Sequence, residues 1–199
     1  MIKTETANFV KYNTCTLGNM NSLTFSLIYL SIGLIIVALV WIITTPISRL
    51  FSKTLPITRL LQISINLAHV LSGILFPLPL PLDIPIRSLG LTIFTIGVCI
   101  AIWAKIVMKD SWGYPGMHLI DKQKILITTG PFEFTRNPIY LGIIIASLGM
   151  AVALKSAFIF LVFILYIVFQ NSIKEEEKQL TKHFGKKYLD YCDKVPRFI

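Results

Sequence analysis

Apolar runs long enough to cross a lipid bilayer constrain this chain more than any other feature. Three of them cover residues 23 to about 45, 57 to about 76 and 86 to about 104. A transmembrane helix needs roughly 20 mostly apolar residues, and a helix satisfies its backbone hydrogen bonds within the segment. Hydrophobic residues make up 54% of the chain and charged residues only 15%, which is unlike a soluble globular domain. The sequence predicts an all-α, polytopic integral membrane protein.

Two further apolar runs follow, at residues 139–154 and 156 to about 171, separated by Lys155. Each is short for a full span at 1.5 Å per residue, so we expect a tight helical hairpin and about five transmembrane helices in all. Residues 1–21 are polar and are predicted to form a poorly ordered N-terminal tail, followed by three transmembrane helices over residues 22–104.

The C-terminal segment is polar and charged but carries an amphipathic pattern. Leu180, Phe184, Tyr188 and Tyr191 repeat at helical spacing, and we expect Gly185 to kink that helix. Residues 175–177 are three consecutive glutamates just after the last apolar run. Acidic residues are unfavourable at a helix C-terminus, so the helix is predicted to continue past them.

The distribution of Lys and Arg predicts the orientation. Most of these cations lie in the connection after the first run, in the long connection over residues 105–136 and in the C-terminal tail. The positive-inside rule then places the N-terminus outside and the C-terminus in the cytosol. The net charge of +9 follows from this topology and from anionic lipids as partners.

Two classes of function are disfavoured by the sequence. The chain has no basic stripe interleaved with aromatic residues of the kind that stacks nucleic-acid bases. Its three cysteines, Cys15, Cys99 and Cys192, are isolated, so neither a metal site nor a disulfide framework is indicated. We therefore expect no nucleic-acid partner and no metal.

Polar residues within the second apolar run share one helical face. Gln62, Asn66, His69 and Gly73 lie at helical spacing, and polar side chains in a membrane span seldom face lipid. They form either the polar wall of a substrate cavity or a set of interhelical hydrogen bonds, with Gly73 allowing close approach. The second interpretation is favoured because such bonds are common in membrane bundles.

The stretch from residue 130 to 142 is the most distinctive local sequence. Pro138 suits the first turn of a helix, so Asn137 is predicted to be the N-cap. Arg136 then lies beside a helix N-terminus, where donors and positive potential favour an anionic ligand group. The alternative is an interfacial arginine that extends to lipid phosphates. His118, in the preceding connection, is either a ligand contact or a solvated loop residue.

Several motifs occur in a fixed order, at residues 124–130, 136–142, 176–180, 184–191 and 195–197. Together they resemble the isoprenylcysteine carboxyl methyltransferase family and, more distantly, the phospholipid N-methyltransferases. The resemblance covers about residues 105–199, which would be the catalytic half. Three positions differ from the family pattern: Asn137 replaces a histidine, Phe132 replaces a tyrosine, and Ser172 stands where the eukaryotic enzymes have a substrate-handling arginine.

The resemblance implies an integral-membrane enzyme that uses S-adenosylmethionine. It implies that Arg136 clamps a carboxylate of the cofactor or the substrate, and that the aromatic side chains pack the cofactor's adenine or ribose. A carboxylate acceptor needs little acid–base catalysis. The implied cofactor contacts are Lys124, Ile125, Leu126, Ile127, Phe132, Asn137, Pro138, Ile139, Tyr140 and Glu176.

Four functions are compatible with this pattern. The first is methyl transfer to a lipid-soluble acceptor, most simply a prenylcysteine-type carboxylate. The second is phospholipid N-methylation, for which His118 or Glu175 is the candidate base. The others are a non-catalytic membrane scaffold and a sterol-reductase-like enzyme with a nicotinamide cofactor.

Overall fold

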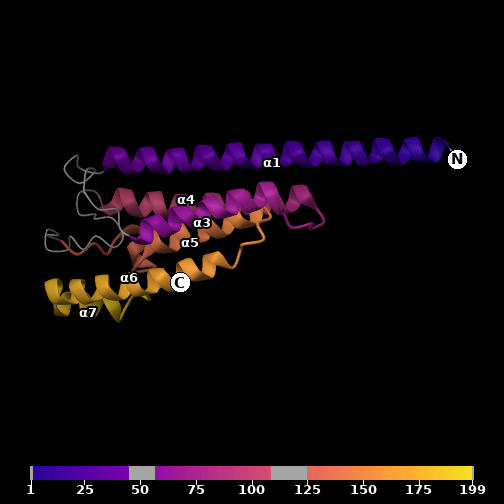
Figure 1. The fold of residues 1–199 in the computed structure, drawn as a ribbon. Coiled ribbons are helices and arrows are strands. Elements are labelled where there is room, and N and C mark those ends of the chain that lie inside the picture. The colour runs from indigo at the N-terminus through magenta and orange to yellow at the C-terminus, as the bar shows by residue number, and fades with distance from the viewer. Residues whose placement is uncertain (1, 45–56, 109–124, 199) are drawn as a thin grey trace.

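The computed structural model describes residues 2–44, 57–108 and 125–198. Every regular element within these residues is helical (Figure 1), as the sequence predicted. The elements are α1 (Ile2–Thr44), α3 (Ile57–Leu75), α4 (Asp83–Met108), the 3₁₀ helix η3 (Gly130–Glu133), α5 (Pro138–Ala153), α6 (Leu161–Phe184) and α7 (Lys186–Cys192).

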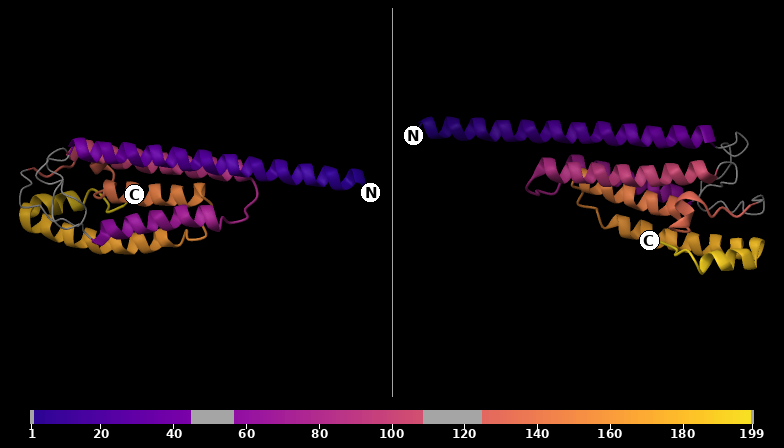
Figure 2. Two further views of the ribbon diagram at one scale, coloured as in Figure 1. Left: turned by 45° about the horizontal axis from the view of Figure 1, so that its top comes forward. Right: turned by 180° about the vertical axis from the view of Figure 1, so that it is seen from behind.

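The long helices run side by side as a bundle (Figures 1 and 2). The described residues contain three helical segments long and apolar enough to cross a membrane: Asn21–Thr44, Ile57–Leu75 and Asp83–Met108. Helix α5 is apolar but has only 16 residues, and α6 becomes charged along its second half. The structure therefore supports a polytopic all-α membrane protein. Within the described residues, α5 and the apolar half of α6 form the shorter pair that the sequence predicted beside three longer helices.

Helix α1 begins at Ile2 and continues without a break to Thr44. The prediction of a poorly ordered tail over residues 1–21 is therefore wrong. The polar residues extend helix α1 before the candidate span Asn21–Thr44, and this part of α1 projects beyond the other helices (Figure 1). The tail was predicted from the polar composition of residues 1–21. However, this segment contains no proline and no glycine before Gly18, so no residue before that point interrupts a helix.

Helices α4 and α5 pack through small residues, so that their backbones nearly touch. A Cβ atom added at Gly90 would lie 2.2 Å from the backbone N of Ala153, and one at Gly149 would lie 2.1 Å from that of Phe94. Gly97 meets the backbone of Ala146 in the same way. Small residues permit this approach in membrane bundles, and these glycine contacts hold α5 closely against α4.

One end of the bundle is held by a buried ion-pair network. Asp83 accepts from Lys155 Nζ at 2.7 Å and from Arg87 Nε at 2.9 Å, and Arg87 also donates to the Ala153 carbonyl at 2.8 Å. These contacts join the start of α4 to the connection between α5 and α6. The predicted hairpin is confirmed, and its charged residue Lys155 is neutralised by Asp83.

The opposite end of the bundle holds the ends of α1 and α4, the start of α3 and α5, and α7 (Figure 1); we call it the site end. Helix α6 continues through the three glutamates, as predicted, and stops at Gly185, whose φ is 57°. The chain turns there into α7. The predicted amphipathic face is confirmed, because Tyr188 and Tyr191 pack with Leu126 and Val195, flanked by Leu180 and Phe184.

Candidate active site at the N-terminal end of helix α5

The loop before α5 is tied to the C-terminal segment of the chain. The Thr135 Oγ1 hydroxyl donates to the Arg197 carbonyl at 2.8 Å, and the Asn137 Nδ2 amide donates to the same oxygen at 3.3 Å. The Arg136 backbone N–H donates to the Pro196 carbonyl at 3.0 Å. Asn137 does occupy the N-cap position, followed by Pro138, but its side chain makes no cap hydrogen bond. The side chain holds the C-terminal segment instead.

Glu177 joins two arginines in a partly buried cluster. Arg136 Nη2 lies 3.1 Å from Glu177 Oε1, and Arg197 donates to both oxygens of the same carboxylate. Arg136 Nη1 also donates to the Cys192 carbonyl at 3.3 Å. The hydrogen bonds that Arg197 donates to Glu177 raise the pKa of Arg197 above its usual value. Both Nη groups of Arg136 thus have partners within the chain, whereas its buried Nε has none among the described residues.

Tyr140 and Glu176, both implied by the family resemblance, lie together. The Tyr140 hydroxyl donates to Glu176 Oε1 at 2.7 Å, although the two residues come from different helices. The buried Tyr140 ring packs edge-on against Phe169, with the ring centroids 4.9 Å apart. The carboxylate of Glu176 is thereby positioned beside the first turn of α5.

The other implied cofactor residues surround the same turn but play different packing roles. Phe132 and Ile139 are buried with Ala104 in an apolar cluster that Ile127 also contacts. Leu126 packs instead with the C-terminal tyrosines. Pro138 is fully buried, Ile125 is 67% exposed, and Lys124 and His118 lie outside the described residues.

Two tyrosines that sequence reasoning noted only as an apolar face are part of this framework. The Tyr191 hydroxyl donates to the Phe132 carbonyl at 2.6 Å. Burial raises the pKa of Tyr191 to about 12, and burial together with the nearby Glu177 raises the pKa of Tyr188 further. Both side chains therefore stay neutral and connect α7 to the loop before α5.

Sequence reasoning missed Glu177 and Arg197 as paired residues and Thr135 altogether. Glu177 lies next to Glu176 in the acidic run, and Arg197 lies in the Val195-Pro196-Arg197 motif. Helical phase was the signal that separates the two glutamates. Successive residues of a helix point about 100° apart, so Glu176 faces Tyr140 while Glu177 faces the arginines.

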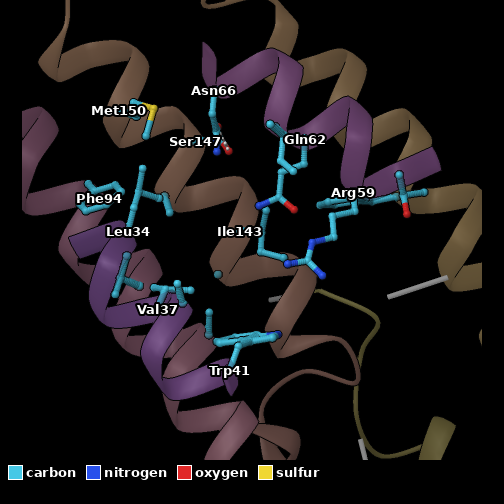
Figure 3. Close-up of a pocket in the computed structure, with 18 of the residues that line it drawn as sticks. Leu34, Val37, Trp41, Arg59, Gln62, Asn66, Phe94, Ile143, Ser147 and Met150 are labelled. Carbon is cyan, nitrogen blue, oxygen red and sulfur yellow. Dashed lines mark hydrogen bonds between the residues drawn. The ribbon is translucent and has the colours of Figure 1, made fainter. Parts of the chain in front are cut away.

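A cavity of about 430 Å³ opens within the bundle next to these residues (Figure 3). It is lined by α1, α3, α4, α5 and α6, and its wall is mostly apolar. Its polar lining residues are Thr58, Arg59, Gln62, Asn66 and Ser147.

The polar face predicted in the second run divides between the two interpretations offered for it. Gln62 and Asn66 line the cavity, and Asn66 accepts from the Ser147 hydroxyl at 3.4 Å. His69 is fully buried and its Nδ1 lies 3.0 Å from Ser156 Oγ, which is a hydrogen bond from α3 to the connection between α5 and α6. Gly73 lies directly against Leu154.

The cavity and the Tyr140–Glu176 pair share a wall. Phe169 lines the cavity and also contacts the Tyr140 ring. Ile143, one turn along α5 from Tyr140, lines the cavity and belongs to the same apolar cluster as Tyr140 and Phe169. An apolar chamber inside the bundle thus ends beside a polar, charged site at the end of α5.

Comparison with known proteins identifies the family of the chain. The family model described as phospholipid methyltransferase matches residues 86–187, slightly more than half of the chain. The chain belongs to this family. The matched region contains most of α4 and all of α5 and α6, which contribute most residues of the candidate site. The membership and the apolar helices together make the chain a membrane protein.

Several known proteins are similar to about half of the chain. The protein-S-isoprenylcysteine O-methyltransferase of Saccharomyces cerevisiae is 26% identical over 118 residues, covering 54% of this chain and 49% of the relative. Form B of Arabidopsis thaliana is 32% identical, covering 56% and 57%, and the Mus musculus protein is 28% identical, covering 56% and 40%. The chain spans about half the length of these relatives. The predicted family resemblance is confirmed, and no solved structure matches the chain.

Proposed function

We propose that this protein is an integral-membrane methyltransferase that uses S-adenosylmethionine to esterify the carboxylate of a lipid-soluble acceptor. The observation that carries this proposal is the shared wall between an apolar intramembrane cavity and the polar site around Tyr140 and Glu176. A lipid-soluble acceptor and a water-soluble donor can meet at such a boundary. The names of the relatives favour a prenylated cysteine as the acceptor.

The residues at the site fit the charge pattern of S-adenosylmethionine. Glu176 offers carboxylate oxygens for ribose hydroxyls or an amino group, and Tyr140 fixes its position. The buried Nε of Arg136, which has no partner among the described residues, is a donor for a carboxylate. Because its Nη groups hold Glu177 and the Cys192 carbonyl, Arg136 offers its Nε as a single donor to the carboxylate that the resemblance assigns to it.

The apolar residues among the implied cofactor contacts pack beneath the polar site residues. Phe132 and Ile139 hold the loop and the first turn of α5 in their apolar cluster, and we assign them a positioning role. Backbone groups near Ile125 and Ile127 are the candidate partners for the adenine edge.

Bound S-adenosylmethionine supplies a methyl group on a sulfonium: as the carboxylate oxygen forms a bond to the methyl carbon, the carbon–sulfur bond breaks and its electron pair stays on sulfur. No proton moves, so the chain needs no general base. Its residues need only align the acceptor and keep water out. Phe169 and Ile143 do this by closing the cavity beside Tyr140 with apolar surface.

The experiment is a methyl-transfer assay on the purified protein. We expect methyl-labelled S-adenosylmethionine and an N-acetyl-S-farnesylcysteine acceptor to give a product whose label is released as methanol in alkali, as a methyl ester requires. The methyl ester of the same acceptor is the matched control and should take up no label. The absence of labelled ester with the carboxylate acceptor would overturn the proposal.

Phospholipid N-methylation is the second candidate, because the matching family model carries that description. The same assay with phosphatidylethanolamine vesicles separates it from the first. An N-methylated product keeps its label in alkali, so alkali-stable label on the phospholipid would support this second function.

The orientation is also a proposal. We place the site end in the cytosol, where S-adenosylmethionine is available, in agreement with the exposed lysines of α6 and α7. Labelling of a Lys178→Cys variant in sealed, oriented vesicles by a membrane-impermeant thiol reagent tests this placement. In vesicles whose lumen corresponds to the cytosol, we expect labelling only after the membrane has been permeabilised.

A further inference from the structure

The cavity has one polar edge, and a single helix provides most of it. Arg59, Gln62 and Asn66 lie on one face of α3 and all line the cavity. Seven residues of helix separate the first from the last, a rise of roughly 10 Å. Figure 3 shows the Arg59 and Gln62 side chains directed from α3 toward the space between α1 and α5.

The opposite side of the cavity is apolar. Helices α1 and α4 contribute Leu34, Val37, Trp41, Phe94 and Val98 to the lining. A ligand that fits both sides is amphipathic, with an apolar chain against α1 and α4 and polar groups against α3. The volume of about 430 Å³ lies in the range of roughly 300–1,000 Å³ that is typical of small-molecule sites.

The charge of the lining selects among amphipathic ligands. Of the residues that line the cavity in the described part of the chain, Arg59 alone carries a formal charge, and none is an aspartate or a glutamate. An arginine at the edge of a mostly apolar chamber favours an anionic group over a cationic one, because water screens charges less there than in bulk solvent. A planar guanidinium also matches a carboxylate in geometry, whereas a protonated amine would meet a like charge.

We infer that Arg59 binds the acidic group of the acceptor and sets the specificity of the cavity for amphipathic acids over amines and neutral lipids. The inference rests on the proposed function, which it deepens by assigning the substrate class to a residue. Gln62 and Asn66, with Ser147 beside Asn66, are placed to pair with amide or hydroxyl groups along the ligand. One carboxylate oxygen is held by Arg59 while the other is left to accept the methyl group.

A binding experiment tests this independently of turnover. The protein is placed in nanodiscs of neutral lipid, and quenching of Trp41 fluorescence by dibrominated octadecanoic acid is compared with quenching by its methyl ester. Trp41 lines the cavity, and a Trp41→Phe variant identifies the part of the signal that comes from it. We expect the wild type to bind the acid about 10- to 100-fold more tightly than the ester, as a charge-assisted contact provides.

Variants of Arg59 carry the decisive comparison. Arg59→Gln should remove the preference for the acid, and Arg59→Lys should keep part of it, since the charge stays while the planar geometry is lost. Lys174→Gln, an exposed cation on α6 that does not line the cavity, is the matched control and should bind like the wild type. Equal binding of acid and ester by the wild type would overturn the inference, as would an intact preference in Arg59→Gln.

The outcome separates this inference from the proposed function. An acid preference that depends on Arg59, in a protein that forms no methyl ester, would retain the binding site and refute the methyltransferase assignment. Ester formation with an unchanged acceptor KM in both Arg59 variants would retain the methyltransferase and refute the role of Arg59.

Discussion

Glu177 offers the sharpest test of how the C-terminal segment holds the site together. Its carboxylate bridges Arg136 and Arg197. The side chain of Glu177 is 15% exposed, that of Arg136 is 14% exposed and that of Arg197 is 34% exposed. Removing one partner of a buried ion pair costs about 3–5 kcal/mol, whereas exposed pairs contribute about 0–1 kcal/mol. Because this cluster is intermediate, we expect Glu177→Gln to lower the free energy of local opening by about 2–3 kcal/mol.

Hydrogen exchange measures that opening directly. The Arg136 N–H donates to the Pro196 carbonyl and the Val195 N–H to the Tyr191 carbonyl, each at 3.0 Å. At 1.4 kcal/mol per tenfold, their exchange in Glu177→Gln should be roughly 30- to 150-fold faster than in the wild type.

Glu175→Gln is the matched control for this experiment. Glu175 is 58% exposed and lies 3.9 Å from Lys178, so its variant should change exchange by less than about threefold. Equal exchange rates in the two glutamine variants would refute the reasoning, because the bridge would then contribute no more than a surface pair.

Three further predictions concern other parts of the framework. Tyr140→Phe should weaken S-adenosylmethionine binding about tenfold in calorimetry, since Glu176 loses the hydroxyl that positions it; unchanged affinity would remove the pair from the site. Tyr191→Phe should lower the thermal unfolding midpoint because the Phe132 carbonyl is left unpaired at a cost of about 1–3 kcal/mol. The pKa of Tyr191 is raised from 10.0 to about 12, so the stability that the neutral Tyr191 side chain contributes is intact below pH 10.0 and is lost as the pH rises through 12. The wild type should therefore lose stability between pH 10.0 and 12, and Tyr191→Phe should lose less. Gly149→Ala should destabilise the protein by at least about 1–3 kcal/mol, since its Cβ would lie 2.1 Å from the Phe94 backbone. A thermal unfolding midpoint as high as that of Leu148→Ala would contradict the close packing of α4 against α5.

Features that depend on the period of a helix could be predicted from the sequence. Gly90 and Gly97 lie seven residues apart on one face of α4, a spacing typical of close helix packing, and both lie against the α5 backbone. The face formed by Leu180, Phe184 and Tyr188 was predicted in the same way. In each example the pattern repeats along one element, so no knowledge of its partner is needed.

Features that depend on which partner competes for a group could not be predicted. Asn137 has the sequence of a capping residue, yet its amide donates to the Arg197 carbonyl, 60 residues along the chain. Arg136 has the position of an anion-binding residue, yet Glu177 occupies its Nη2. Both partners come from the C-terminal half of the chain, and the fold alone brings them to this loop.

The cavity is a third feature of this kind. Gln62 and Asn66 were compatible with either a cavity wall or helix packing, because the sequence does not reveal which neighbouring helix lies close. In the structure α5 packs against α4 through glycines, and Gln62 and Asn66 of α3 line the cavity.

Calorimetric titration of the detergent-purified protein with S-adenosylmethionine, with NADPH as the comparison, tests the central claim most directly. We predict saturable binding of S-adenosylmethionine, none of NADPH, and a loss of affinity of about 1.5–3 kcal/mol in Glu176→Gln. Glu175→Gln should bind like the wild type. Absence of S-adenosylmethionine binding by the wild type, or full affinity in Glu176→Gln, would contradict the cofactor site placed at the end of α5.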